Sequence, residues 1–101
     1  MSDTIEKLVK TIKSRKENDV KSSYTSFLLS KGNDHCLNKC REELKELEDA
    51  IKNKKNMIHE SADVIYHLLV TLESAGINFD DIMKELNNRE GTSGFEEKRN
   101  R

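Results

Sequence analysis

The sequence predicts an all-α fold, a bundle of four to five helices in one domain. Apolar residues recur at steps of three and four along most of the chain, which is typical of amphipathic helices. No stretch shows the alternation of a half-buried strand, and no proline interrupts the 101 residues. A chain of this length corresponds to one domain. We expect residues 1–90 to form that domain and residues 91–101 to be a flexible tail.

The first helix is predicted to run from a cap at Asp3 or Thr4 to about Lys16. Its apolar residues share one face of the helix and are Ile5, Leu8, Val9 and Ile12. Residues 17–23 are polar and turn-forming, so we expect a loop there.

A short helix that begins with residues 27–29 and ends at Gly32 should follow this loop. The second long helix then opens at Asn33 or Asp34. Its apolar residues alternate steps of three and four over two heptads, which predicts a packing seam. The seam consists of Leu37, Cys40, Leu44, Leu47 and Ile51.

The third helix, over residues 57–72, is the least polar part of the chain, and Gly76 terminates it. The turn 53–56 before it is so short that the second and third helices should be antiparallel neighbours. One stripe of the third helix consists of Ile58, Ala62, Ile65, Leu69 and Leu72. Because further apolar residues widen that stripe, we expect burial on most sides. One short chain cannot cover such a helix, so we predict a homodimer that completes the core.

A fourth helix should begin after Asn78, its predicted cap, and reach about Arg89. Asp81 occupies its third position, as in a capping box. Ile77 and Ile82 are placed to form a hydrophobic staple across its first turn.

Composition excludes several classes of function. The formal net charge of −1 gives no general attraction to nucleic acid or to an anionic membrane. Neither a signal peptide nor a span of about twenty apolar residues is recognisable, so we expect a soluble, cytoplasmic protein.

Cys36 and Cys40 lie four residues apart on one helix, which does not suit a disulfide, and no second Cys/His pair completes a zinc site. We interpret both as small core residues.

Two pairs of carboxylates form the candidate site. Glu43 and Glu46 share one face of the second long helix, and Glu60 and Asp63 share one face of the third. If the two helices are antiparallel, the pairs meet, and their mutual repulsion then calls for a cation. Oxygen ligands without cysteine favour Mg²⁺ or Mn²⁺. The competing interpretation is a solvated acidic face, which is common in a chain that is 37% charged.

Several motifs together resemble the phosphoribosyl-ATP pyrophosphohydrolases, which belong to the all-α MazG-like nucleotide pyrophosphohydrolase superfamily. The resemblance covers nearly the whole chain. The carboxylate pairs are shared by the wider superfamily, and the other motifs narrow the resemblance to this family. The motifs are Ser23-Tyr24-Thr25-Ser26, Glu42-Glu43-x-x-Glu46, Glu60-x-x-Asp63, Tyr66-His67-Leu68-Leu69-Val70, Arg89 and Ser93-Gly94-Phe95-Glu96-Glu97-Lys98.

The resemblance implies Mg²⁺-dependent hydrolysis of phosphoribosyl-ATP between its α and β phosphates. The products are phosphoribosyl-AMP and pyrophosphate, and the reaction is the second step of histidine biosynthesis. One departure lies beside the carboxylates, where Arg41 stands in place of the glycine that is usual in the family. Its side chain would contact phosphate or point to solvent.

Roles for individual residues follow as hypotheses. The metal ligands would be Glu43, Glu46, Glu60 and Asp63. Glu42 would be a further ligand, the base that orients the attacking water, or an exposed helix carboxylate. His67 would be an additional metal ligand or a hydrogen-bonded core histidine.

Substrate contacts are assigned to hydroxyl and cationic side chains. Ser23, Tyr24 and Thr25 would offer donors to ribose or phosphate, although Tyr24 equally suits a packing role. Lys39, one turn before Glu43, would contact phosphate or form an ion pair with the residue four positions on. Arg89 would bind phosphate or complement the dipole of the fourth helix. Lys31 and Arg15 would add positive charge near helix ends.

Two other functions remain open from the sequence. A house-cleaning nucleoside triphosphate pyrophosphohydrolase would use the same carboxylates on a different nucleotide. A non-catalytic helical interaction module would use its acidic residues only to solvate the bundle.

Overall fold

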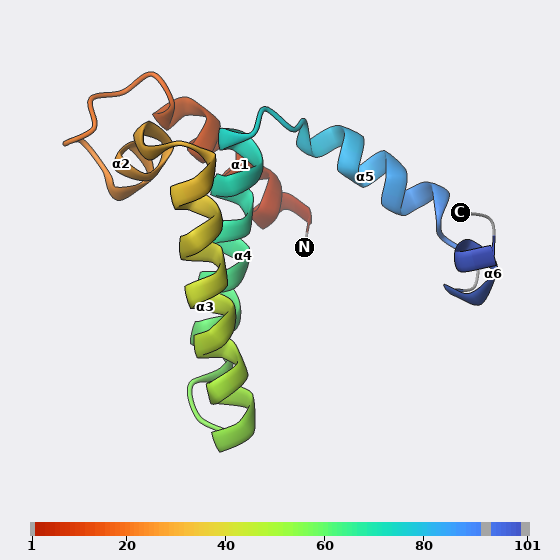
Figure 1. The fold of residues 1–101 in the computed structure, drawn as a ribbon. Coiled ribbons are helices and arrows are strands. Elements are labelled where there is room, and N and C mark those ends of the chain that lie inside the picture. Colours follow the sequence, from red (N-terminus) through yellow and green to blue (C-terminus); the bar gives the residue numbers. More distant parts are fainter. Residues whose placement is uncertain (1, 92–93, 100–101) are drawn as a thin grey trace.

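The computed structural model describes residues 2–91 and 94–99, and all regular secondary structure in them is helical (Figure 1). The helices are α1 (Ser2–Arg15), α2 (Tyr24–Lys31), α3 (Asn33–Asn53), α4 (Met57–Ser74), α5 (Phe79–Asn88) and α6 (Gly94–Arg99). The predicted all-α class is therefore confirmed. Four of the first five helices lie close to their predicted bounds, whereas α2 begins at Tyr24, earlier than predicted, because Ser23 caps it. The short α6 lies in the predicted flexible tail, whose mobility stays a prediction.

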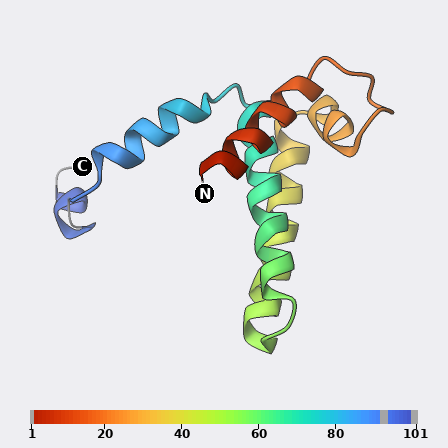
Figure 2. The same ribbon diagram turned by 180° about the vertical axis from the view of Figure 1, so that it is seen from behind.

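An antiparallel hairpin of α3 and α4 is the longest part of the molecule (Figures 1 and 2). Only three residues connect the helices, and two of them, Lys54 and Asn56, adopt left-handed backbone conformations with φ of 54° and 59°. The amide of Lys55 donates to the carbonyl of Ala50 at 3.0 Å and closes the end of α3. The predicted short turn and antiparallel arrangement are confirmed.

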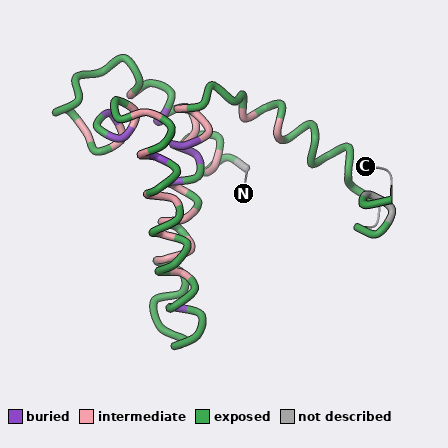
Figure 3. The backbone as a smooth tube through the Cα atoms, viewed as in Figure 1, coloured by how far each residue is buried: buried purple, intermediate pink, exposed green. Residues whose placement is uncertain are grey.

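The other end of the hairpin is covered by α1 and α2, and there the core lies (Figure 3). Its buried members come from four helices and are Ile12, Leu28, Cys36, Leu69 and Val70. The thiol of Cys36 donates to the carbonyl of Leu28 at 3.3 Å, and the hydroxyl of Thr71 donates to the carbonyl of Cys36 at 3.2 Å. Cys36 is thus a core residue as predicted, whereas Cys40 is only half-buried.

The predicted packing seam of α3 is largely exposed within one copy of the chain. Leu44 is 57% exposed and Ile51 is 56% exposed, because α3 turns a neighbouring stripe toward α4, with Cys36 and Ala50 as its buried members. Burial on most sides of α4 was predicted for a dimer and stays a prediction, and within one copy Ile58 is 87% exposed. Both helices therefore carry apolar surface that the described part of the chain leaves uncovered.

Helix caps agree with the sequence at some ends and not at others. The predicted cap at Asp3 or Thr4 is wrong, because α1 already includes both residues. Ser23 caps α2 by accepting a hydrogen bond from the amide of Ser26 at 3.0 Å. Asn78 caps α5 as predicted and accepts from the amide of Asp80 at 2.9 Å.

Helix α5 extends away from the hairpin (Figures 1 and 2), and none of its residues is fully buried. The chain turns into it at Gly76, whose φ of 75° lies in the left-handed region that glycine adopts without strain. Among the described helices, none combines the length and apolarity needed to cross a membrane.

Candidate metal centre

The hairpin brings the two predicted carboxylate pairs together. Carboxylate oxygens of Glu43 and Glu46 on α3 and of Glu60 on α4 all lie within 4.8 Å of one another. A second group on α4 combines Glu60 with Asp63 and with His59, again within 4.8 Å. Glu60 belongs to both groups, so the two form one continuous centre between the helices.

Glu43 is a largely enclosed carboxylate of this centre. Its side chain is only 18% exposed, and its Oε2 atom is buried without a hydrogen-bond partner among the described residues. The pKa of Glu43 is raised from 4.5 to about 7. The largest cause is a hydrogen bond that its protonated form makes with Glu46, followed by burial and by the negative charges of Glu46, Asp63 and Glu60.

These properties are those of a cation site. A buried oxygen without a partner is costly, and carboxylates this close to each other repel unless positive charge lies between them. A hard dication such as Mg²⁺ or Mn²⁺ would bind these oxygens and remove both costs. Exposed acidic residues are common without a metal, but the orphaned Oε2 of Glu43 is not exposed. The residues therefore fit a divalent cation.

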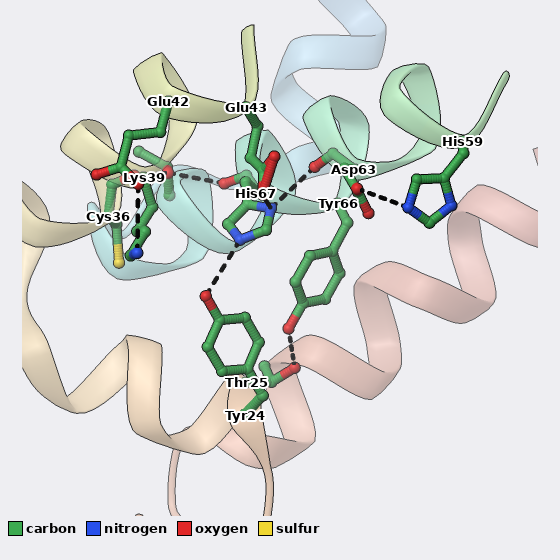
Figure 4. Close-up of polar contacts among 11 residues, drawn as sticks. Tyr24, Thr25, Cys36, Lys39, Glu42, Glu43, His59, Asp63, Tyr66 and His67 are labelled. Carbon is green, nitrogen blue, oxygen red and sulfur yellow. Dashed lines mark hydrogen bonds and ion pairs between the residues drawn. The ribbon is translucent and has the colours of Figure 1, made fainter. Parts of the chain in front are cut away.

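His67 lies next to Glu43 and Asp63 and is buried (Figure 4). Its Nδ1 is 2.9 Å from the carbonyl of Asp63, so Nδ1 carries the proton and donates to that oxygen. The Nε2 atom can then accept from the hydroxyl of Tyr24 at 3.5 Å. His67 lies 4.0 Å from Glu43 Oε1 and belongs to neither ligand group. Of its two predicted roles, the geometry favours the hydrogen-bonded core histidine.

The start of α2 is fixed beside α4 by aromatic and hydroxyl contacts. The hydroxyls of Thr25 and Tyr66 are hydrogen-bonded, and the ring of Tyr24 stacks on that of Tyr66 with centroids 6.5 Å apart (Figure 4). Ser23 uses its hydroxyl as the cap of α2. Of the three predicted donors, Tyr24 is the most exposed, at 50% of its surface.

Lys39 and Glu42 pair with each other on α3, with Nζ 3.3 Å from Oε1 (Figure 4). Lys39 therefore forms an ion pair on its own helix, but with Glu42 three residues on and not with the residue four positions on, as predicted. Glu42 is exposed and belongs to neither of the two ligand groups. Arg41, the departure from the family pattern, donates to the side chain of Asn38 at 2.6 Å and remains exposed.

Three predicted cationic residues are not brought to the carboxylates in one copy of the chain. Arg89 lies at the end of α5, away from the hairpin, where its Nε contacts Glu85 at 2.9 Å. Lys31 lies over the ring of Phe27, 5.2 Å from its centroid. Arg15 ends α1, and its carbonyl accepts from the hydroxyl of Ser26.

His59 is the site residue that the sequence analysis missed. Its Nε2 lies 3.3 Å from Asp63 Oδ2 across one turn of α4 (Figure 4). The signal was present as His-Glu-x-x-Asp, a nitrogen donor one turn before the last carboxylate. Such a spacing is also that of an ordinary ion pair on a helix, and so it did not stand out.

Comparison with known proteins gives a consistent result. Residues 5–90 match the family model described as phosphoribosyl-ATP pyrophosphohydrolase. The chain is 44% identical to a phosphoribosyl-ATP pyrophosphatase of Dechloromonas aromatica, covering 98% of this chain and 94% of that protein. A phosphoribosyl-ATP pyrophosphatase of Rhodobacter capsulatus is 41% identical, with 93% of each chain covered. One from Bacillus cereus is 42% identical, over 90% of this chain and 87% of that protein.

Proposed function

The chain belongs to the phosphoribosyl-ATP pyrophosphohydrolase family, and on that premise we propose that it hydrolyses its substrate with a divalent cation held between α3 and α4. It is a hydrolase of histidine biosynthesis, which converts phosphoribosyl-ATP to phosphoribosyl-AMP and pyrophosphate. The observation that carries the cation dependence is the buried, unpartnered oxygen of Glu43 among converging carboxylates. We propose Mg²⁺ as the resident ion, with Mn²⁺ as an effective substitute.

The reaction sets three requirements. Cleavage of a phosphoanhydride in a polyanionic chain needs neutralised charge, a water in line with the bond, and stabilisation of the leaving pyrophosphate. A bound dication supplies Lewis acidity at phosphate oxygens and lowers the pKa of a coordinated water. The residues of this chain that would hold the ion are Glu43, Glu46, Glu60 and Asp63. They stand on two rigid helices joined by a short turn, which fixes their geometry before substrate binds.

Glu42 and Lys39 suit roles at the rim of this centre. Glu42 lies one helical turn before Glu46, so its carboxylate faces the same side of α3 and can accept a hydrogen bond from the attacking water. Of its predicted roles we therefore propose the water-orienting base over the metal ligand. The ammonium of Lys39, now 3.3 Å from Glu42, is exposed enough to contact a substrate phosphate.

Further substrate contacts are proposed for the start of α2 and for α5. Tyr24, which is half exposed, would contact ribose or phosphate, while Ser23 and Thr25 hold α2 in place and offer backbone donors. A phosphate contact by Arg89 requires α5 to lie near a carboxylate centre. In one copy of the chain, α5 extends away from that centre (Figure 1).

We also propose that the protein is a homodimer. The exposed apolar side chains of Leu44, Ile51 and Ile58 lie on the two longest helices, where exposure to water is unfavourable. A second copy would cover them through a self-complementary contact. A cytoplasmic location remains a prediction, supported by the role in amino-acid biosynthesis.

Turnover assays test the function and the roles of the ligands. We expect phosphoribosyl-ATP to be hydrolysed in preference to dUTP and other nucleoside triphosphates when Mg²⁺ is present. The variants Glu60→Gln and Asp63→Asn should lose about a hundredfold or more of kcat/KM with an unchanged circular dichroism spectrum. Glu48→Gln removes an exposed carboxylate elsewhere on α3 and is the matched control, expected to be neutral.

Two results would contradict the proposal. Preference for an ordinary triphosphate would indicate the house-cleaning function on the same centre. Unchanged turnover in Glu60→Gln and Asp63→Asn would mean that these carboxylates only solvate the helices.

A further inference from the structure

The junction of α2 and α3 carries a group of aromatic and cationic side chains, which we call the aromatic corner: Tyr24, Phe27, Lys31 and His35. The first three are spaced by three and four residues, so they share one side of α2. The ring centroid of Phe27 lies 6.3 Å from that of Tyr24, and the two rings are nearly parallel at 20°. The centroid of His35, on α3, lies 6.1 Å from that of Phe27 with the rings perpendicular.

Contacts link the aromatic corner to the candidate metal centre. The hydroxyl of Tyr24 lies 3.5 Å from Nε2 of His67, and His67 in turn lies next to Glu43 (Figure 4). Along α3, His35 precedes Glu43 by eight residues, which corresponds to about 12 Å at a rise of about 1.5 Å per residue. Lys39 lies midway between them. The corner therefore lies on the same side of α3 as the carboxylates, about two helical turns away.

The aromatic corner contains a buried polar atom that no contact explains. Nε2 of His35 is buried and has no hydrogen-bond partner among the described residues. Within that part of the chain, the one other such side-chain atom is Oε2 of Glu43, which the proposed cation would bind. A buried polar atom without a partner is costly. The rings beside it are open to water, since Phe27 is 37% exposed and Tyr24 is 50% exposed. These properties suit a flat ligand with a hydrogen-bonding edge.

We propose that Phe27 and His35 form the subsite for the purine base of phosphoribosyl-ATP. The base would pack on the exposed surface of the Phe27 ring, and one of its polar ring atoms would form a hydrogen bond with Nε2 of His35. The imidazole reaches the base by turning about its side-chain bonds. This inference rests on the proposed function, and it adds residues that recognise the part of the substrate remote from the cleaved bond.

The order of these residues along the molecule matches the order of groups along the substrate. The carboxylates between α3 and α4 would hold the cleaved phosphoanhydride through the cation. Tyr24, already proposed to contact ribose or phosphate, lies between those carboxylates and Phe27. Lys31 lies one turn beyond Phe27 on α2, with its exposed ammonium over the Phe27 ring. From there Lys31 would bind the phosphate of the second ribose, which the base also carries.

The competing explanation is that Phe27 and His35 only pack α2 against α3. His35→Phe separates the two explanations, because it keeps a flat ring and removes the unpaired nitrogen. Under both, the melting temperature should be unchanged or higher, since a buried unpaired atom is lost. Under the proposal alone, KM for phosphoribosyl-ATP should rise about tenfold while kcat changes less than about twofold, as for a contact made equally in the ground and transition states.

A matched pair of variants tests the ring of Phe27. Phe27→Leu keeps an apolar side chain and should raise KM about tenfold, because a base stacks on an aromatic ring and not on leucine. Phe27→Tyr keeps the ring and should leave KM within about twofold. Lys7→Gln, at an exposed position of α1, is the control and should leave both parameters unchanged. Circular dichroism checks that each variant is folded.

Nuclear magnetic resonance with the product phosphoribosyl-AMP tests the contact directly. With three histidines and three phenylalanines in the chain, the signals of His35 and Phe27 can be assigned from their variants. We expect nuclear Overhauser effects between the base protons and the Phe27 ring. We also expect the ¹⁵N shift of Nε2 of His35 to change on binding, as a new hydrogen bond requires.

The contrary results are distinct for the two proposals. Suppose that the unmodified protein hydrolyses phosphoribosyl-ATP, but KM is unchanged in both Phe27→Leu and His35→Phe, or the base gives no Overhauser effect to Phe27. The base then lies elsewhere, and the proposed function survives. A fall in kcat without a rise in KM would also overturn the subsite. If phosphoribosyl-ATP is not hydrolysed at all, the proposed function and the subsite are both wrong.

Discussion

The two ends of the α3–α4 hairpin differ in how they are covered. At the end that contacts α1 and α2, Leu28 and Val70 are each 1% exposed, whereas toward the turn Ile51 and Ile58 lie open to water. The candidate metal centre lies between these ends. The difference indicates that one copy of the chain supplies a complete core at one end and half of a core at the other.

Truncation in the covered end should give the largest effect on stability. Leu28→Ala removes a buried side chain of the core, and we expect the free energy of unfolding to fall by about 2 to 4 kcal/mol. Ile58→Ala, at the exposed end, is the matched control and should cost under about 0.5 kcal/mol in a monomeric state. Urea denaturation measures the free energy of unfolding of both variants. Equal losses in the two variants would contradict the difference between the two ends of the hairpin.

A charge placed on the open surface should act on association. In Leu44→Glu a carboxylate replaces an apolar side chain that we propose to be covered by a second copy. The dissociation constant of the dimer should rise about tenfold to a hundredfold, because an unpaired charge is costly to bury. Sedimentation equilibrium measures it, with the exposed Lys45→Glu as control on the adjacent position. A wild-type chain that sediments as a monomer at micromolar concentration would contradict the proposal.

The candidate metal centre should make the stability of the metal-free protein depend on pH. Because the folded state raises the pKa of Glu43 from 4.5 to about 7, it binds this proton more tightly than the unfolded chain does. The protonated Glu43 therefore stabilises the folded state. This contribution is fully present below the pKa of Glu43 in the unfolded chain and is lost as the pH rises through its pKa in the folded state. We expect the free energy of unfolding to fall by about 1 to 2 kcal/mol between about pH 5 and pH 8, allowing for solvent screening.

Two controls define the origin of that pH dependence. Glu43→Gln should flatten it, and saturating Mg²⁺ should remove it because the ion replaces the proton. A fall of the same size in Glu43→Gln would assign the effect to other groups.

Local signals in the sequence were sufficient for most of the fold. The helix-stopping Gly32 and Gly76, the cap at Asn78 and the short turn after α3 act within a few residues, so they fix the bounds of the helices. The same locality explains the carboxylate pairs, since spacing along two neighbouring helices determines where Glu43 and Glu60 point.

Longer-range features were not predictable in the same way. An apolar stripe indicates that a surface is covered but not by which chain, and so Leu44 and Ile51 were expected to lie in a seam that one copy leaves open. The direction of α5 depends on the backbone angles at Gly76, which no side-chain pattern determines. His59 was missed because its spacing from Asp63 is equally that of a simple ion pair.

The three-residue turn between α3 and α4 has a consequence for how the protein folds. Glu46 and Glu60 are only fourteen positions apart in the chain, so the loop that joins them has a low entropic cost of closure. The whole carboxylate cluster can then assemble from local contacts before α1 and α2 arrive, but against its own electrostatic repulsion. A dication that enters at this point would act as a folding ligand, accelerating hairpin closure as well as stabilising the finished protein.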